Sequence, residues 1–151
     1  MKISLNRINQ DYLFEAKSSN DLTVLMDNKS KTEGKVEGIS PMEVLLMGVA
    51  GCSSIDIVAI LNKQRINPVT LRMEVEGIRD ANAVPAPFQG INVTLFLEGD
   101  DITPEKAKRA SQLSFEKYCS VSKSLDPNII INQIIHIMMY LPFLHPHRVP
   151  I

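Results

Sequence analysis

The sequence predicts an α+β fold in which short antiparallel strands precede and follow one long, buried helix. Two observations carry this prediction. Residues 40–65 form a single apolar stretch with the start and stop signals of a helix, and the stretches on both sides alternate between apolar and polar residues as strands do. With 151 residues, 44% of them hydrophobic, the chain is long enough for one domain with a sizeable core.

The long helix begins with a capping box. Ser40 is a good N-cap, Pro41 suits the first helical position because its missing N–H needs no partner there, and Glu43 follows the cap by three residues. From Val44 to Leu61 nearly every residue is apolar or small on all faces, and Pro68 prevents continuation. A chain this short has difficulty covering such a helix, so we expect a second copy to cover part of it in a homodimer.

Two other interpretations fit the composition of this helix. A transmembrane span is long enough, but Ser53, Ser54 and Asp56 interrupt the apolar stretch and strands flank it, so we expect no membrane insertion. The helix also contains Cys52. Because free cysteine is among the most buried residue types, an inert core thiol is the structural alternative to a reactive one.

Three short strands are predicted before the helix, over Lys2–Ile8, Tyr12–Ala16 and Leu22–Met26, with turn residues between them. They form an antiparallel meander. The polar, glycine-containing stretch Asp27–Gly38 is predicted to be an exposed loop that leads into the long helix.

Two longer strands follow the helix and pair as a hairpin. Val69–Arg79 alternates, with Leu71 and Met73 among the residues on its apolar face, and Gly90–Glu98 alternates in the same way. By the same parity Arg79 points to the apolar face, where a charge is expected only if it is paired or lines a site. The alternative is that the strand has ended by then and Arg79 is in water.

A second helix and a last strand complete the predicted domain, residues 1–138. Thr103 caps the helix, Pro104 is its first residue and it extends to about Tyr118. Cys119 follows near the start of one further turn or a break, and the last strand covers Asn128–Met138. Residues 139–151 are an apolar, proline-rich tail for which the sequence indicates no role.

Composition excludes several functions. Lys and Arg number 16 against 17 Asp and Glu, so no basic field attracts nucleic acid or anionic lipid. The N-terminus lacks an uninterrupted apolar signal segment, which predicts a cytoplasmic protein with reduced thiols. Two Cys and three His, scattered, make a poor metal site, and His145 and His147 in the tail suggest one only weakly. We expect neither metal nor cofactor.

The segment SPMEVLLMGVAGCSSIDIVAIL and the later EKYCSVSKSL closely resemble the OsmC/Ohr family, in particular its YhfA-like branch. The resemblance covers roughly Tyr12–Ile137 and includes the R-x(5)-P-x-P-F connection at Arg79–Phe88. It implies the OsmC-like fold, with antiparallel sheets packed around the long helix, in an intertwined dimer. It also implies that Cys52 attacks an organic hydroperoxide and that Cys119 resolves the sulfenic acid as a disulfide, which an external dithiol reduces.

The chain departs from the peroxidase pattern of that family. Members that reduce hydroperoxides carry an acidic residue directly after the helix-start proline, where this chain has Met42, and Glu43 comes one residue late. They also use an arginine from an N-terminal strand, and residues 12–26 contain none. Asp56, four residues after Cys52, places a like charge near any thiolate there. Arg79 is the available cation to offset it.

Two classes of function therefore stay open. The first is a thiol-dependent peroxidase with Cys52, Cys119 and Arg79 in its active site and Met42, Glu43, Leu46 and Phe88 around its substrate. The second is a dimeric binding or redox-sensing protein whose central pocket holds an apolar or thiol-containing small molecule. Binding without turnover would favour the second class.

Overall fold

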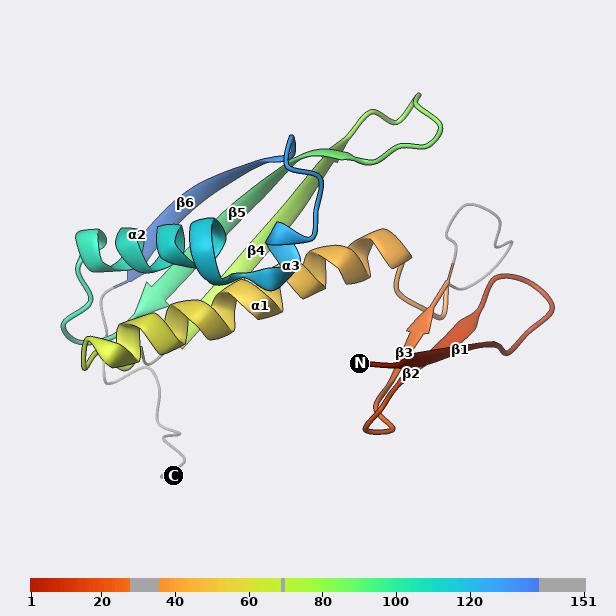
Figure 1. Cartoon of the computed structure of the whole chain (residues 1–151), viewed down its shortest axis with the longest axis horizontal. Coiled ribbons are helices and arrows are strands. Elements are labelled where there is room, and N and C mark those ends of the chain that lie inside the picture. Colours follow the sequence, from red (N-terminus) through yellow and green to blue (C-terminus); the bar gives the residue numbers. More distant parts are fainter. Residues whose placement is uncertain (28–35, 69, 139–151) are drawn as a thin grey trace. The chain divides into compact units, whose positions relative to one another are not determined.

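The computed structural model describes residues 1–27, 36–68 and 70–138 (Figure 1). Its backbone forms two compact units, Met1–Met47 and the part of the chain from Gly48 on. The tail with His145 and His147, and residues 28–35 of the predicted exposed loop, lie outside the described residues. In chain order the elements are β1 (Ile3–Arg7), β2 (Phe14–Ser18), β3 (Thr23–Met26), α1 (Pro41–Lys63), β4 (Thr70–Arg79), β5 (Phe88–Glu98), α2 (Pro104–Leu113), η1 (Ser114–Tyr118), α3 (Ser120–Lys123) and β6 (Ile130–Met138).

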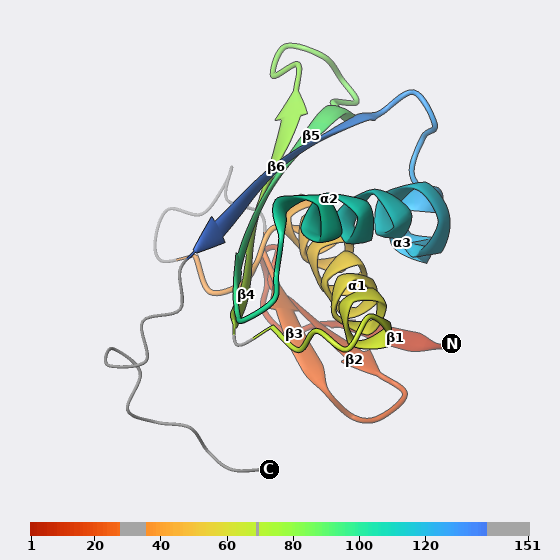
Figure 2. The same ribbon diagram turned by 90° about the vertical axis from the view of Figure 1, so that its left-hand side faces the viewer.

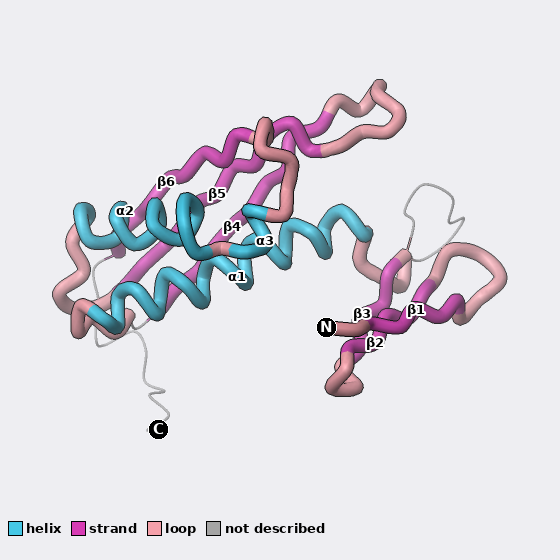
Figure 3. The backbone as a smooth tube through the Cα atoms, viewed as in Figure 1, coloured by secondary structure: helices cyan, strands magenta, loops and turns pink. Residues whose placement is uncertain are grey.

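The first unit contains the predicted antiparallel meander, with strand order β1-β2-β3 (Figure 3). Phe14 in β2 pairs with Arg7 in β1 and with Met26 in β3. Every residue of β1 is exposed, including the apolar Ile3 and Leu5. The edge strand β1 therefore buries little apolar surface, whereas every residue of β2 is half-buried.

Both ends of α1 follow from local sequence. At the start, the backbone N–H of Ser40 donates to Glu43 Oε2 at 2.9 Å, as the predicted capping box requires. At the end, the Ile66 N–H donates to the Leu61 carbonyl at 3.1 Å and the Arg65 N–H to Asn62 at 2.9 Å. Arg65 has the left-handed φ of 61° that this Schellman motif needs.

The second unit is built on a sheet of order β4-β5-β6. β4 and β5 form the predicted antiparallel hairpin, with Met73 opposite Leu95. β6 pairs with β5 in parallel, so this sheet is mixed, a feature that the expectation of antiparallel sheets did not include. The reason is the connection, because α2 carries the chain back along the sheet before β6 begins.

The core of the second unit lies between this sheet and the two helices α1 and α2, which cover the same face (Figure 2). On β4 the residues that face the helices alternate with exposed ones, as the sequence predicts. The opposite face mixes polar and apolar residues: Asn92 Nδ2 donates to Glu76 Oε2 across the hairpin at 3.3 Å, and Ile130 and Ile134 of β6 are exposed. The buried cluster consists of Ile57, Leu61, Ile66, Leu95, Leu97, Ile102, Ala107 and Ala110.

The described part of the chain buries one stripe of α1, formed by Val49, Ser53, Ile57 and Leu61 at four-residue intervals. Ile55, on the other side, is 73% exposed. By length and composition alone, α1 is long and apolar enough to cross a membrane. Core helices of soluble proteins often meet the same criterion. In this structure 22% of the most apolar 18-residue window of α1 is buried. Much of this apolar helix is therefore not covered by the described residues of a single chain.

At the loop end of the hairpin, where residues 80–87 join the two strands, the pairing register shifts between Ile78 and Arg79. The ring of Phe88 is buried and occupies the position where a side chain at Gly77 would begin. Gly77 is therefore required by this close approach. The bulge ends the alternation, and Arg79 is exposed with its guanidinium 5.9 Å from the centre of the Phe88 ring.

Candidate active site

The fold brings Cys52 and Cys119 together, although they lie on different helical elements. The two Sγ atoms and one carboxylate oxygen of Asp56 all lie within 4.8 Å of one another. Cys52 and Asp56 are four residues apart on α1 and so share one face of that helix. Both are half-buried, whereas Cys119 is fully buried.

Cys119 is positioned by an irregular helical junction. After α2 the chain makes one π-type turn, η1, in which the Cys119 N–H donates to the Ser114 carbonyl at 2.8 Å. Cys119 then caps α3, and its Sγ accepts a hydrogen bond from the Ser122 N–H at 3.5 Å. The position of Cys119 at the start of a further helical turn confirms the sequence prediction. The π turn was not predicted, and such turns are frequent at functional sites.

This junction packs directly on α1 (Figure 1). A β-carbon at Gly48 would be 3.5 Å from Val121 Cγ1, so α3 lies beside the turn of α1 that precedes Cys52. The hydroxyl of Ser114 lies 3.3 Å from Asp56 Oδ2 and 3.4 Å from the Ser53 carbonyl, within reach of either acceptor. Sequence reasoning missed Ser114, whose only signal is a small polar residue at a buried position of a helix.

The surroundings of the two thiols differ. Burial raises the pKa of the Cys119 thiol above its ordinary value, and the neighbouring Cys52 raises it further through a hydrogen bond and charge. Hydrogen bonds from Ser122 act in the opposite direction but are weaker than the effect of burial. The Cys119 thiol is therefore protonated at neutral pH. Cys52 is only half-buried, so its sulfur is the more accessible of the two.

No cation balances this cluster within the described part of the chain. There, Asp56 accepts a hydrogen bond from Ser114 and forms no ion pair. No described hydrogen bond or ion pair joins Arg79 to Cys52, and the guanidinium lies over Phe88 instead. The role of Arg79 as activating cation stays a prediction.

The predicted substrate-pocket residues fall in two different parts of the structure. Met42, Glu43 and Leu46 lie in the first two turns of α1, in the first unit, and Phe88 is buried at the start of β5, in the second. Glu43 accepts the capping hydrogen bond from the Ser40 N–H. A substrate role for these four residues is a prediction that the single chain does not test.

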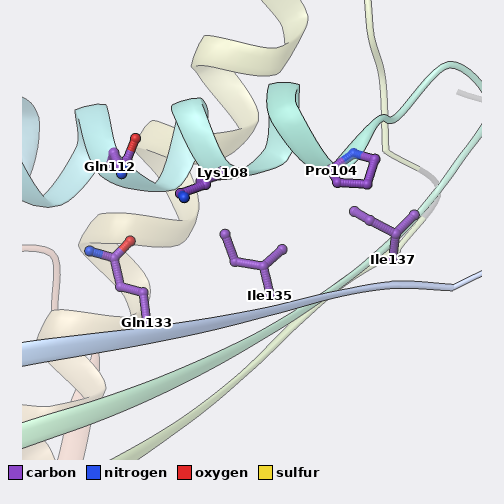
Figure 4. A pocket seen from close by; sticks show the side chains of 6 residues that line it. All are labelled: Pro104, Lys108, Gln112, Gln133, Ile135 and Ile137. Atoms are coloured by element: carbon purple, nitrogen blue, oxygen red, sulfur yellow. The ribbon is translucent and has the colours of Figure 1, made fainter.

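The second unit also has an open groove of about 600 Å³ between α2 and β6 (Figure 4). Ser111 on α2 donates to Gln133 Oε1 at 2.6 Å beside it. Neither cysteine lines this groove, so it is separate from the thiol pair. Its lining residues are Pro104, Lys108, Gln112, Gln133, Ile135 and Ile137.

Comparisons with known proteins agree on one family. A model of the OsmC-like protein family matches residues 32–133. Protein YhfA of Escherichia coli K12 is 36% identical over 118 residues, which make up 78% of this chain and 84% of YhfA.

Solved structures share the fold. A hypothetical protein from Aquifex aeolicus VF5 has a TM-score of 0.79 at 24% identity, covering 93% of this chain and 97% of that one. The organic hydroperoxide resistance protein OhrB of Bacillus subtilis has a TM-score of 0.64 at 19% identity, covering 89% and 96%. The family match and the identity to YhfA show that this chain belongs to the OsmC-like family, in its YhfA-like branch, and the paired cysteines agree with that assignment.

Proposed function

We propose that this protein reduces organic hydroperoxides, with Cys52 as the peroxidatic and Cys119 as the resolving cysteine. The observation that carries the proposal is the approach of the two Sγ atoms to within 4.8 Å, from two helices that are distant in sequence. The name of the structural neighbour OhrB, an organic hydroperoxide resistance protein, supports the same class of substrate.

The reaction balances with these two thiols alone. The Cys52 thiol first gives up its proton, and the thiolate attacks the outer oxygen of the hydroperoxide. The O–O bond breaks, the departing alkoxide takes up one proton and leaves as an alcohol, and Cys52 becomes a sulfenic acid. Cys119 then attacks the Cys52 sulfur, water leaves, and a disulfide forms. An external dithiol supplies two electrons and two protons to restore both thiols. A cytoplasmic location, where thiols are kept reduced, fits this requirement.

The geometry suits the second step. A disulfide needs a separation of about 2.05 Å between sulfurs, so at most about 3 Å must be closed. Cys119 heads the four-residue helix α3, and a small shift of this short element would move its sulfur toward Cys52. The resolving thiol stays protonated and shielded until the sulfenic acid forms, because burial raises its pKa.

A homodimer is part of this proposal. In a single copy of the chain, Ile55 on α1 is exposed, together with apolar residues of β1 such as Ile3 and Leu5. A second copy that covers these surfaces would remove them from water at about 25 cal/mol per Å². Equilibrium sedimentation should give a dimer at micromolar concentration, and a stable folded monomer there would contradict the proposal.

The decisive experiment measures consumption of cumene hydroperoxide with a dithiol as reductant, followed by peptide mapping. We expect turnover and an intrachain Cys52–Cys119 disulfide in the wild type. Cys119→Ser should stop at a sulfenic acid that dimedone traps on Cys52, and Cys52→Ser should lose both products. Two free thiols after peroxide treatment would refute the proposal. Arg79→Met tests the proposed cation, and unchanged alkylation of Cys52 near neutral pH would exclude Arg79.

One observation favours the second candidate, a binding or redox-sensing protein. Asp56 lies beside both sulfurs, and no described cation accompanies it. A like charge disfavours the thiolate that fast peroxide reduction needs. A protein that forms the disulfide slowly, with no sustained turnover when dithiol is present, would support redox sensing.

A further inference from the structure

We propose that the reduced protein binds a thiophilic divalent cation of the Zn²⁺ class through Cys52, Asp56 and Cys119. The three side chains offer two sulfurs and one carboxylate oxygen within 4.8 Å of one another. Three protein ligands leave the fourth position of a tetrahedral ion open to water or to another small ligand.

The spacing of the donor atoms fits such an ion. Bond lengths of about 2.3 Å to sulfur and about 2.0–2.2 Å to oxygen place tetrahedral ligand atoms roughly 3.5–3.8 Å apart. Because no two of these atoms are more than 4.8 Å apart, no pair has to close by more than about 1.3 Å. Cys52 and Asp56 approach from successive turns of α1 and Cys119 from a separate element, so the ion would join two parts of the fold.

Groups around the cluster support the ligands. The Ser114 hydroxyl is within hydrogen-bond reach of Asp56 Oδ2, and the Ser122 N–H donates to Cys119 Sγ at 3.5 Å, a contact that stabilises a thiolate. Two thiolates and a carboxylate carry three negative charges, and no described side chain forms an ion pair with them. A divalent cation would neutralise most of that charge.

The sequence expectation of no metal site came from the scattered Cys and His residues. It did not consider Asp56 as a ligand, although an i, i+4 pair on a helix is a common way to chelate an ion. Metal binding itself does not depend on peroxidase activity. A consequence rests on the proposed function: the Cys52–Cys119 disulfide would remove both sulfur ligands, so oxidation would release the ion.

The test uses Co²⁺ as a spectroscopic substitute for Zn²⁺, with the full-length, fully reduced protein and no oxygen. We expect one Co²⁺ per chain, with visible bands of a tetrahedral ion and a near-ultraviolet band from sulfur to cobalt. Zn²⁺ should displace the Co²⁺. Absence of the sulfur-to-cobalt band at saturating Co²⁺ would refute the inference.

Variants locate the site. Cys52→Ser and Cys119→Ser should each lose at least half of the sulfur-to-cobalt intensity, and Asp56→Asn should weaken binding by at least tenfold. Ser114→Ala should weaken it by about tenfold, as expected for a partner that orients a ligand. Asp100→Asn, in an exposed turn, is the matched control and should bind normally. Binding that survives Cys52→Ser unchanged, or is lost in a His145→Ala/His147→Ala double variant, would place the ion elsewhere.

A second readout needs no variant. Saturating Zn²⁺ should slow alkylation of both cysteines of the wild type by at least tenfold, and a chelator should restore the rate. Equal rates with and without Zn²⁺ would overturn the inference. A protein that binds metal but consumes no hydroperoxide would refute the proposed function alone. One that consumes hydroperoxide without a metal–sulfur band would refute only the metal site.

Discussion

Replacing Asp56 by Asn should make Cys52 more reactive. The carboxylate oxygen lies within 4.8 Å of Cys52 Sγ, and both residues are half-buried. At that separation two like charges repel by about 1–2 kcal/mol for an effective dielectric constant of about 40–80. Asn has the same shape as Asp and keeps an oxygen that accepts a hydrogen bond from the Ser114 hydroxyl. The substitution therefore removes the negative charge and changes little else.

The expected result is a gain of about 5- to 30-fold in the rate at which iodoacetamide alkylates Cys52 near neutral pH, since 1.4 kcal/mol corresponds to a factor of ten. The assay uses a Cys119→Ser background, so that one thiol is measured, and a chelator to exclude metal. Asp100→Asn is the control and should leave the rate unchanged. An unchanged rate would show that Asp56 does not act on the thiolate. A slower rate would mean that the carboxylate assists ionisation, contrary to this reasoning.

Three further predictions concern stability. Gly77→Ala should lower the free energy of unfolding by about 1–3 kcal/mol in urea, because its β-carbon would clash with the Phe88 ring, and Gly90→Ala should lower it less. Arg65→Gly should raise it by about 0.5–1 kcal/mol, because Arg65 holds a φ of 61°; a loss would indicate contacts of the arginine that outweigh this strain. Burial raises the Cys119 pKa, so the folded state keeps this proton longer than the unfolded chain. The resulting stabilisation is complete below the ordinary value of 9.0 and is lost as pH rises above it. In urea unfolding, the free energy of unfolding of Cys119→Ser should fall less between neutral and alkaline pH than that of the wild type. Equal losses in the two proteins would contradict this assignment.

Much of the fold could be predicted because its signals are local. The capping box at Ser40, the alternation along β4 and the cap at Thr103 each depend on residues a few positions apart, and the structure confirms all three. For the segment after Tyr118 the sequence left a further helical turn or a break open, with Cys119 near its start. The structure has the turn, and the Cys119 sulfur accepts a hydrogen bond from the Ser122 N–H.

The alternation rule left two positions open for Arg79, the apolar face or water, and the structure has the second. Parity directs its side chain to the apolar face, but the register shift after Ile78 intervenes and Arg79 is exposed. The same stretch makes a contact across the hairpin, where the Phe88 ring fills the space above Gly77. A rule that reads one strand at a time cannot include the partner strand that bends it.

The amino-acid sequence by itself determined the two long helices and the hairpin, and it pointed to Cys52 and Cys119 as the candidate reactive residues. Only the tertiary structure decided that Cys52, Asp56 and Cys119 share one cluster, that Ser114 reaches Asp56, and that β6 lies parallel to β5. Secondary structure follows from side-chain periodicities of two residues in strands and 3.6 in helices, and these periodicities depend only on residues close together in the sequence. The distance between two sulfurs on separate helices depends instead on how α2, its π turn and α3 pack on α1, and that packing is set by the whole core at once.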